Sequence, residues 1–540
     1  MLSLLCLSLA VPVQDPTPLI LEGDPTPDGF VVQFLGKMIV ASDGSWVVGV
    51  NTTNTDTGID DYLLRDGVPF LTPGDPIPGL GSGLDFYLDF DHAGAGLTAY
   101  TGTTLAGDGF AVLEDSLLAV EGDALPAFLG LPAGTTWQRI EDVQVVPSGR
   151  VMLPVQIQQP GVSGTTSAIV VFETDAAHQI TGGHVAAIVG RTLSSGETAD
   201  FVFTSENETR INDSGQVFWW GFDSAGSGIL AVDDQVVATS NSPSPEPGLD
   251  WRSFAGPELD LNDSGEWIAR AQVTSFPRDV VMASDGLVAR QSSSHPAFPA
   301  FTAGDFGFNA PVFIANDGRE MFYVDMSGTG STADDEGYVV GDALVVREGV
   351  TQAGGNTIVA VSDGRTGYRM SRNGSHLIFE ADVDDGGVIR EGAFLLALSA
   401  PNVGTNYCTA VPNSTGVPAS IAATGSDVFA DNDLSVVATS LPLNTFGIFV
   451  VSQTQGNVPM AGGEGTLCLG GAIGRYQNQI VNSGAGGTFG LDIDLTAVPS
   501  PTMLYAATPG TTLNFQGWFR DVSMAGATSN YTDGVSVLTQ

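Results

Sequence analysis

The chain has 540 residues, and 61 acidic against 18 basic residues give a formal net charge of −43. Such a surface repels phosphate groups, which proteins bind through clustered Lys and Arg, so nucleic acid and anionic membranes are excluded as expected partners. The 69 glycines and 30 prolines, with only 15% charged residues, favour many short strands joined by turns. We therefore expect an all-β chain.

The N-terminus, residues 1–13, is short and apolar. Ser8 and Ala10 place small residues where a signal peptidase cleaves, although a positively charged start is missing. This pattern predicts a signal peptide over 1–13 and a secreted or cell-surface protein. No later stretch reaches the roughly 18 apolar residues that a membrane-spanning helix needs, so we expect no membrane span.

One short turn recurs seven times along the chain. In each copy a small polar cluster ends in glycine and runs directly into an apolar strand, as in Ser42-Asp43-Gly44-Ser45-Trp46. The turn glycines are Gly44, Gly94, Gly149, Gly215, Gly265, Gly318 and Gly374. A β-repeat of roughly 50 residues is typical of a propeller blade, and Asp-Gly or Asn-x-x-Gly supplies the left-handed backbone that a tight hairpin needs.

The seventh repeat lacks an outer strand. A matching segment occurs at the N-terminus, where residues 18–24 resemble residues 68–75 in the first repeat. We therefore expect a seven-bladed β-propeller over residues 17–400, closed by the N-terminal strand, which would remove the exposed sheet edges. The alternative is an open array or solenoid. Apolar runs such as Val217-Phe218-Trp219-Trp220 predict that Trp219 and Trp220 pack between blades on opposite sides; sugar stacking is the alternative.

A second module is expected over residues 404–540, where the repeated turn is absent. Alternating strands, such as Phe489 to Leu495, indicate a β-sandwich-like domain with one solvated face. Its two cysteines, Cys408 and Cys468, form an even pair in an exported chain and predict a disulfide; two free buried thiols are the alternative.

Both parts resemble families of exported bacterial proteins. The turns at Asn212–Trp219 and Asn262–Ala269 resemble the NxxGxxxF tandem repeat of secreted, propeller-like proteins of environmental bacteria, with Phe322 and Trp219 at the aromatic position. Ala269 and Ile378 depart from that pattern. Residues 467–476 and 514–521 resemble a C-terminal module of many large secreted proteins of such bacteria. These resemblances imply export and a binding or sorting role, and they bring no catalytic residue.

Calcium is the one cofactor for which the sequence provides a motif. Asp260, Asn262 and Ser264, followed by Gly265, repeat the first half of a calcium-binding loop, with oxygen ligands at alternate positions. The residue at the twelfth position is Ala271 rather than a bidentate Glu. The alternative is that these side chains cap the turn by accepting backbone N–H hydrogen bonds.

No nucleophile elbow, zinc motif or phosphate-binding loop is found, so the sequence names no catalytic or cofactor-binding residue. The favoured function is an exported, non-enzymatic binding or scaffold protein. Its propeller channel would contact an extracellular polysaccharide, protein or surface component, and its C-terminal module would serve sorting or attachment. The alternative is a secreted polysaccharide hydrolase or lyase with carboxylates at the channel mouth, which a deep pocket of carboxylates with Arg or His would favour. A purely structural envelope component is the third hypothesis.

Overall fold

The computed structural model describes residues 15–540 apart from residues 28, 55–59, 95, 206–207, 255–257, 308–309, 399–401, 430–431, 461–462 and 524–525. The predicted signal peptide, 1–13, lies outside the described residues. Within them the regular structure consists of strands and one 3-10 turn, η1 (Ala127–Leu129), which confirms the all-β prediction. No described helix is long and apolar enough to cross a bilayer. The chain divides into two compact units, unit 1 up to residue 399 and unit 2 from residue 400.

Seven antiparallel sheets form the described part of unit 1, and each sheet is built from consecutive strands apart from the contribution of β1. Sheets 1 to 3 contain β2 (Val32–Val40), β3 (Trp46–Thr52), β4 (Asp61–Arg65) and β5 (Val68–Leu71); β6 (Leu84–His92), β7 (Thr98–Thr104), β8 (Gly109–Leu113) and β9 (Ser116–Val120); β10 (Thr136–Ile140), β11 (Gln144–Val145), β12 (Val151–Gln158), β13 (Thr166–Thr174) and β14 (Ile180–Ile188). Sheets 4 and 5 contain β15 (Ala199–Val202), β16 (Thr209–Ile211), β17 (Val217–Asp223), β18 (Gly228–Val232) and β19 (Gln235–Thr239); β20 (Trp251–Ser253), β21 (Leu259–Leu261), β22 (Trp267–Val273), β23 (Asp279–Ala283) and β24 (Gly286–Arg290). Sheets 6 and 7 contain β25 (Thr302–Asp305), β26 (Phe313–Ile314), β27 (Glu320–Ser327), β28 (Glu336–Val340) and β29 (Ala343–Arg347); β30 (Gln352–Ala353), β31 (Asn356–Val361), β32 (Tyr368–Met370), β33 (His376–Asp385), β34 (Val388–Ala397) and β1 (Thr17–Leu21).

The repeated turn occupies the same place in every sheet. It joins the inner strand of a sheet (β2, β6, β11, β16, β21, β26 or β32) to the next strand along the chain. All seven turn glycines have positive φ, from 70° at Gly374 to 133° at Gly94, as the hairpin interpretation predicts. A residue with a Cβ is strained in this backbone conformation, so the glycine allows each copy to reverse direction.

Each pair of consecutive sheets encloses its own hydrophobic core. The core between sheets 4 and 5 contains Trp220, whereas that between sheets 3 and 4 contains Trp219, so the two indoles pack on opposite faces of β17. Both are buried, at 3% and 0% exposure, which confirms their prediction as core residues. A further core joins sheet 7 to sheet 1, through Ile378 and Ala393 on one side and Val48 on the other. Because both faces of most strands are buried, the strands read as continuous apolar runs.

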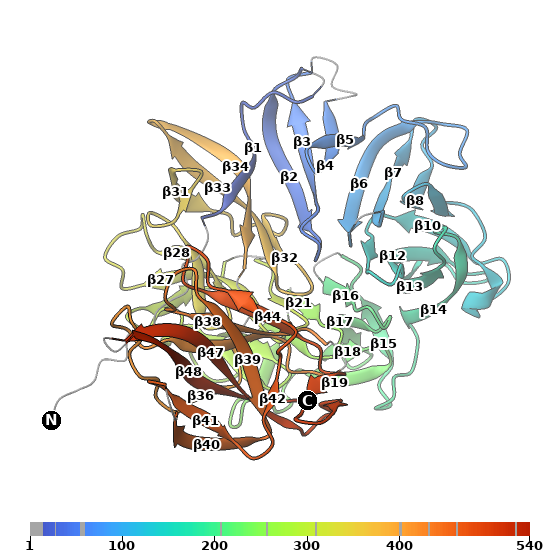
Figure 1. Cartoon of the computed structure of the whole chain (residues 1–540). Helices are drawn as coiled ribbons and strands as arrows, with labels where there is room; N and C mark the ends of the chain where they lie inside the picture. The colour runs from blue at the N-terminus through green and yellow to red at the C-terminus, as the bar shows by residue number, and fades with distance from the viewer. Residues whose placement is uncertain are drawn as a thin grey trace. The chain divides into compact units, whose positions relative to one another are not determined.

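The first strand of the chain pairs with the last sheet of unit 1. β1 runs antiparallel to β34, with Pro18 opposite Phe394 and Leu21 opposite Gly392. In Figure 1 the dark blue β1 lies beside the orange β34 and close to β2. Hydrogen bonds between the inner strands and turns of neighbouring sheets link each sheet to the next and the seventh to the first: Ser45 Oγ with His92 Nε2, Val145 N to Asp91 Oδ2, Ser148 N to Asp213 Oδ1, Asp213 N to Asp263 Oδ1, Asp263 N to Asn316 Oδ1, Asn316 N to Arg372 O, and Asn373 Nδ2 to Ser42 O.

Unit 2 contains two larger sheets and two hairpins. Sheet 8 consists of β35 (Asn402–Val403), β37 (Ser420–Gly425), β38 (Leu434–Thr439) and β44 (Phe489–Ile493). Sheet 9 consists of β36 (Thr405–Tyr407), β39 (Phe446–Ser452), β42 (Gly474–Arg475), β43 (Val481–Asn482), β47 (Thr512–Ser523) and β48 (Gly526–Leu538). The hairpins are β40 (Thr454–Pro459) with β41 (Thr466–Gly470), and β45 (Val498–Pro499) with β46 (Leu504–Tyr505). One hydrophobic core is shared by both sheets, with Val436 and Ile493 from sheet 8 and Phe449 and Phe515 from sheet 9.

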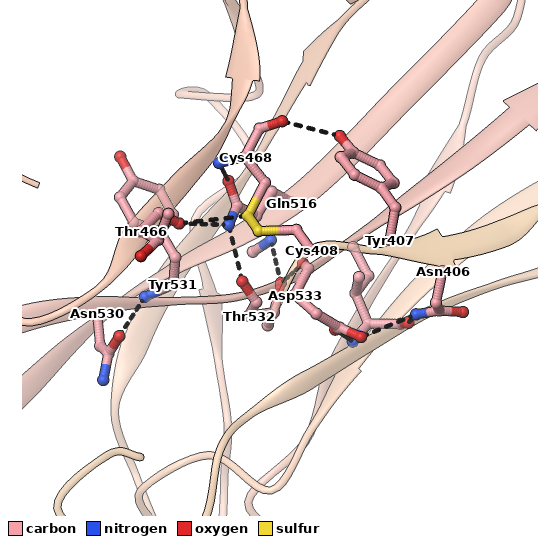
Figure 2. The surroundings of a disulfide bond; sticks show 12 residues. Asn406, Tyr407, Cys408, Thr466, Cys468, Gln516, Asn530, Tyr531, Thr532 and Asp533 are labelled. Atoms are coloured by element: carbon pink, nitrogen blue, oxygen red, sulfur yellow. Dashed lines mark hydrogen bonds between the residues drawn. A yellow bond between two sulfur atoms is a disulfide. The ribbon is translucent and has the colours of Figure 1, made fainter. Parts of the chain in front are cut away.

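Cys408 and Cys468 form a disulfide, as predicted, with their Cα atoms 6.2 Å apart. Figure 2 shows the bond beside a buried amide: Cys468 N donates to Gln516 Oε1 over 2.9 Å, and Gln516 Nε2 donates to Thr532 O over 2.7 Å. The Tyr407 hydroxyl donates to Cys468 O over 3.1 Å. The disulfide therefore ties the start of unit 2 to the β40–β41 hairpin, beside the hydrogen bonds of Gln516 and Tyr407.

Candidate functional site

Charged side chains gather where the inner strands of unit 1 meet. Four pairs of basic and acidic side chains lie there: Lys37 with Asp89 at 2.7 Å, Arg369 with Asp91 at 3.4 Å, Arg210 with Asp260 at 3.5 Å, and Arg365 with Glu258 at 3.6 Å. We call these eight residues the central charge cluster. It holds the single lysine of a chain that has only 18 basic residues. Four of the 18 basic side chains of this acidic protein therefore lie in this one cluster.

The acidic members of the cluster also complete the backbone hydrogen bonding of the inner strands. Asp91 Oδ2 accepts from Val145 N over 2.9 Å, and Asp260 Oδ2 accepts from Ile314 N over 3.0 Å. An inner strand has no partner strand on its free edge, and a buried N–H without an acceptor is costly. Carboxylates from the preceding inner strand supply those acceptors.

Burial acts differently on two carboxyl groups of the cluster. It would raise the pKa of Asp91, but Arg369, Lys37 and the Val145 N–H outweigh burial and hold that pKa below its usual value. For Glu258, burial prevails over Arg365, Arg210 and Arg270 and raises the pKa to about 8. Glu258 is 1% exposed, and neither of its carboxyl oxygens has a hydrogen-bond partner. Glu258 is therefore largely protonated at neutral pH.

The cluster leaves little free space. The two cavities among its side chains measure about 30 and 10 Å³. Volumes of this size match single water molecules and are too small for a sugar or a peptide segment. Arg372 also reaches across from the seventh turn to donate to Ile211 O over 2.6 Å. The carboxylates and arginines that would favour catalysis in a deep pocket are thus present together, but they are packed against one another.

A larger cavity, of about 310 Å³, lies beside this cluster, and we call it the acidic cavity. Its lining comprises Arg270, Asp305, Gly307, Tyr323, Asp325, Glu336 and Asp363, from sheets 5, 6 and 7. Three of these carboxylates are direct cross-strand neighbours: Asp325 lies opposite Asp305 on one side and Glu336 on the other. Like charges directly opposite one another destabilise a sheet. Such a row is therefore costly in the absence of a ligand.

The titration of the acidic cavity follows from its burial. Burial, Asp335 and Asp305 raise the pKa of Asp325. Burial also raises the pKa of Glu336, although a hydrogen bond with the Tyr323 hydroxyl partly offsets it. Raised carboxyl pKa values next to a guanidinium, Arg270, and a phenol in one cavity are typical of functional sites. The cavity can both donate and accept hydrogen bonds.

The calcium candidates lie in the fifth turn, next to the central charge cluster. Asn262 Oδ1 accepts from Ser264 N over 3.1 Å and from Glu266 N over 2.9 Å, so it caps the turn. Asp260 Oδ2 accepts a hydrogen bond from Ile314 N, and Asp260 Oδ1 lies 3.5 Å from Arg210 Nε. Across the described residues, no group of three or more His, Cys, Asp and Glu is placed to hold a metal ion. These hydrogen bonds favour the turn-capping alternative.

The sequence did not single out the residues of the acidic cavity. A usable signal exists for the central charge cluster, because four of its members occupy equivalent places before the repeated turn: Asp91, Arg210, Asp260 and Arg369. Opposite charges at equivalent places of a closed repeat predict ion pairs. The acidic cavity has no such signal, since its residues come from different strands and loops.

No family model matches the chain, and no curated protein matches it. Among solved structures, the WD40 beta propeller domain of Doa1 is 10% identical, with 67% of this chain and 94% of that chain covered and a TM-score of 0.26. A subtype N11 neuraminidase-like protein of A/flat-faced bat/Peru/033/2010 is 11% identical, with 71% and 97% covered and a TM-score of 0.27. The PQQ-bound aldose sugar dehydrogenase of Streptomyces coelicolor is 12% identical, with 59% and 96% covered and a TM-score of 0.24. At such TM-scores these resemblances establish neither a common fold nor a common function.

Proposed function

We propose that unit 1 is a seven-bladed β-propeller closed by β1, that unit 2 is a β-sandwich, and that the protein is exported. Seven sheets, a hydrophobic core between each consecutive pair, and the hydrogen bonds from the seventh turn to Ser42 support the closed ring. The shared core of sheets 8 and 9 supports the sandwich. The disulfide supports an oxidising, extracellular location.

On this fold, the protein is a non-enzymatic binding protein for an extracellular polysaccharide, with the acidic cavity as its binding site and unit 2 serving sorting or attachment. The row Asp305, Asp325 and Glu336, facing Arg270 and Tyr323 in one cavity, carries this proposal. Sugar hydroxyls both donate and accept, so they satisfy the carboxylates and the guanidinium together. Hydroxyl donors also weaken the repulsion between the carboxylates.

Affinity gel electrophoresis of the full chain in gels that contain dextran, laminarin, xylan or alginate tests the proposal. Asp305→Asn removes one exposed carboxylate of the row and is expected to weaken retardation several-fold. Asp123→Asn is the control, because Asp123 is an exposed carboxylate in the turn that follows β9 and lies outside the acidic cavity. Equal retardation of both variants and the unmodified chain would rule out this cavity as the site.

A second candidate is a polysaccharide hydrolase or lyase that uses the same cavity. It is favoured by the raised pKa values of Asp325 and Glu336, because a raised pKa favours the protonated form that a general acid needs. Release of reducing ends or unsaturated products from the same polysaccharides, lost in Glu336→Gln, would establish catalysis. Binding without product release would support the binding protein.

A further inference from the structure

A second cavity of unit 1, separate from the acidic cavity, is lined by residues of sheets 3 and 4 and of the segments next to them. It measures about 500 Å³, within the range of small-molecule binding sites. Its lining comprises Gln156, Thr165, Thr166, Ser167, Val189, Asp200, Phe201, Phe203, Thr204, Ser205 and Glu208. We call it the aromatic cavity.

One wall of the aromatic cavity is a rigid row of aromatic rings. Trp220, at 3% exposure, anchors the row in the core between sheets 4 and 5. Phe203 stacks on Trp220 with ring centroids 3.7 Å apart and planes at 7°. Phe201 packs against Phe203 at 4.6 Å and is 45% exposed. An exposed ring held by a buried stack presents a fixed apolar platform to the cavity.

The rest of the lining is mostly polar. It includes Thr165, which precedes β13, and Thr166 and Ser167 at the start of that strand. Gln156 Nε2 donates to Ser167 Oγ over 2.8 Å, which fixes both side chains. At the other end of the lining, Ser205 Oγ donates to the buried carboxylate of Glu208. The cavity thus pairs a flat apolar platform with hydroxyl and amide groups.

We propose that the aromatic cavity binds a neutral sugar ring of a polysaccharide. A pyranose has one face of C–H groups, which packs on an aromatic ring, and a periphery of hydroxyls, which need donors and acceptors. The lining of this cavity contains groups that meet both requirements. The inference extends the proposed polysaccharide binding by a second subsite, in which Phe201 carries the stacking contact.

The test uses the full chain, Phe201→Ala and a matched control, Phe86→Ala. Phe86 lies on the first strand of sheet 2 with 46% exposure, so the two substitutions remove rings of the same size and exposure. Each protein is run in gels with dextran, laminarin or xylan, which are neutral, and with alginate, which is anionic. Circular dichroism melting verifies that both variants fold.

Phe201→Ala is expected to lose at least five-fold in affinity for the neutral polysaccharide that retards the unmodified chain, and Phe86→Ala is expected to retain it. Retardation that is unchanged in Phe201→Ala, confined to alginate, or absent in every neutral gel overturns the proposal. Asp305→Asn reports separately on the acidic cavity. Sensitivity to Phe201 without sensitivity to Asp305 would leave this inference standing and remove the proposed binding site.

Discussion

At the scale of single residues, burial decides what the charged groups of this protein do. Asp91 keeps its charge because Arg369 and Lys37 lie beside it, whereas Glu258 retains its proton because its oxygens are buried without hydrogen-bond partners. Both occupy the same charged centre of unit 1. They differ in protonation because they differ in their distances from basic side chains and hydrogen-bond donors. Those distances depend on contacts between repeats and cannot be read from one repeat.

Glu258 makes stability depend on pH. Its pKa is raised from 4.5 to about 8 on folding, so the folded chain binds this proton more tightly. Its stabilising contribution is complete below about pH 4.5 and is lost as pH rises toward 8. Between pH 5 and 8.5, the free energy of unfolding of the unmodified chain should therefore fall by about 3 kcal/mol more than that of Glu258→Gln, which cannot ionise.

Urea unfolding at both pH values measures this difference. Glu464→Gln, at an exposed position in unit 2, is the control and should keep the slope of the unmodified chain. A Glu258→Gln variant that loses as much stability toward high pH as the unmodified chain would show that Glu258 is ionised throughout.

Calcium provides a second prediction at this scale. Since Asn262 Oδ1 already accepts two backbone N–H groups, and Asp260 is held by Ile314 N and Arg210, EDTA should leave the melting temperature unchanged. Differential scanning calorimetry with EDTA and with millimolar Ca²⁺ measures this. A fall of several degrees in EDTA, restored by Ca²⁺, would instead establish a calcium site in this turn.

At the scale of elements, the sequence predicts the turns and many of the strands. The turn glycines, the pairing of β1 with the last sheet and the strand at Phe446–Ser452 follow from local pattern. The sequence did not predict that β15 and the inner strand β16 are separate strands that both pair with β17. Such interruptions depend on tertiary contacts, and Phe203, Thr204 and Ser205, which follow β15, line the aromatic cavity. The two cavities could therefore not be predicted from the sequence.

Removal of β1 tests the pairing of the chain's first strand. A chain that starts at Glu22 loses the buried Ile20 and exposes the edge of β34. An unpaired strand edge promotes association between chains, so we expect a melting temperature lower by several degrees and concentration-dependent oligomers. Size-exclusion chromatography and calorimetry measure both effects. A chain that starts at Asp15 is the control, and identical behaviour of the two chains would contradict the role assigned to β1.

The disulfide is expected to act on unit 2 alone. It closes a loop with a sequence separation of 60 residues, for which chain entropy gives about 3–4 kcal/mol. Cys408→Ser with Cys468→Ser should therefore lower the urea midpoint of the unit 2 transition and leave that of unit 1 in place. Fluorescence and circular dichroism follow the two transitions, and an unchanged unit 2 midpoint would show that the bond adds no stability.

At the scale of the whole chain, the net charge of −43 is balanced locally at the centre of unit 1. The single lysine and three arginines are paired with acidic groups at the centre of unit 1, so the excess of carboxylates lies elsewhere. Each of the seven sheets that carry the repeated turn would expose apolar faces if it stood alone. Each instead shares a core with its neighbours, and the core between sheets 7 and 1 completes the circuit.

Closure of that circuit is the central claim, and a cross-link between the first and seventh turns measures it most directly. Ser375 Oγ lies 3.3 Å from Ser42 O, so Ser42→Cys with Ser375→Cys should form a disulfide under mild oxidation, detected by mass spectrometry of the joined peptides. Ser42→Cys with Ser214→Cys, which pairs the first turn with the fourth, should not. Absence of the first cross-link, or equal formation of both, would contradict a closed ring of seven sheets.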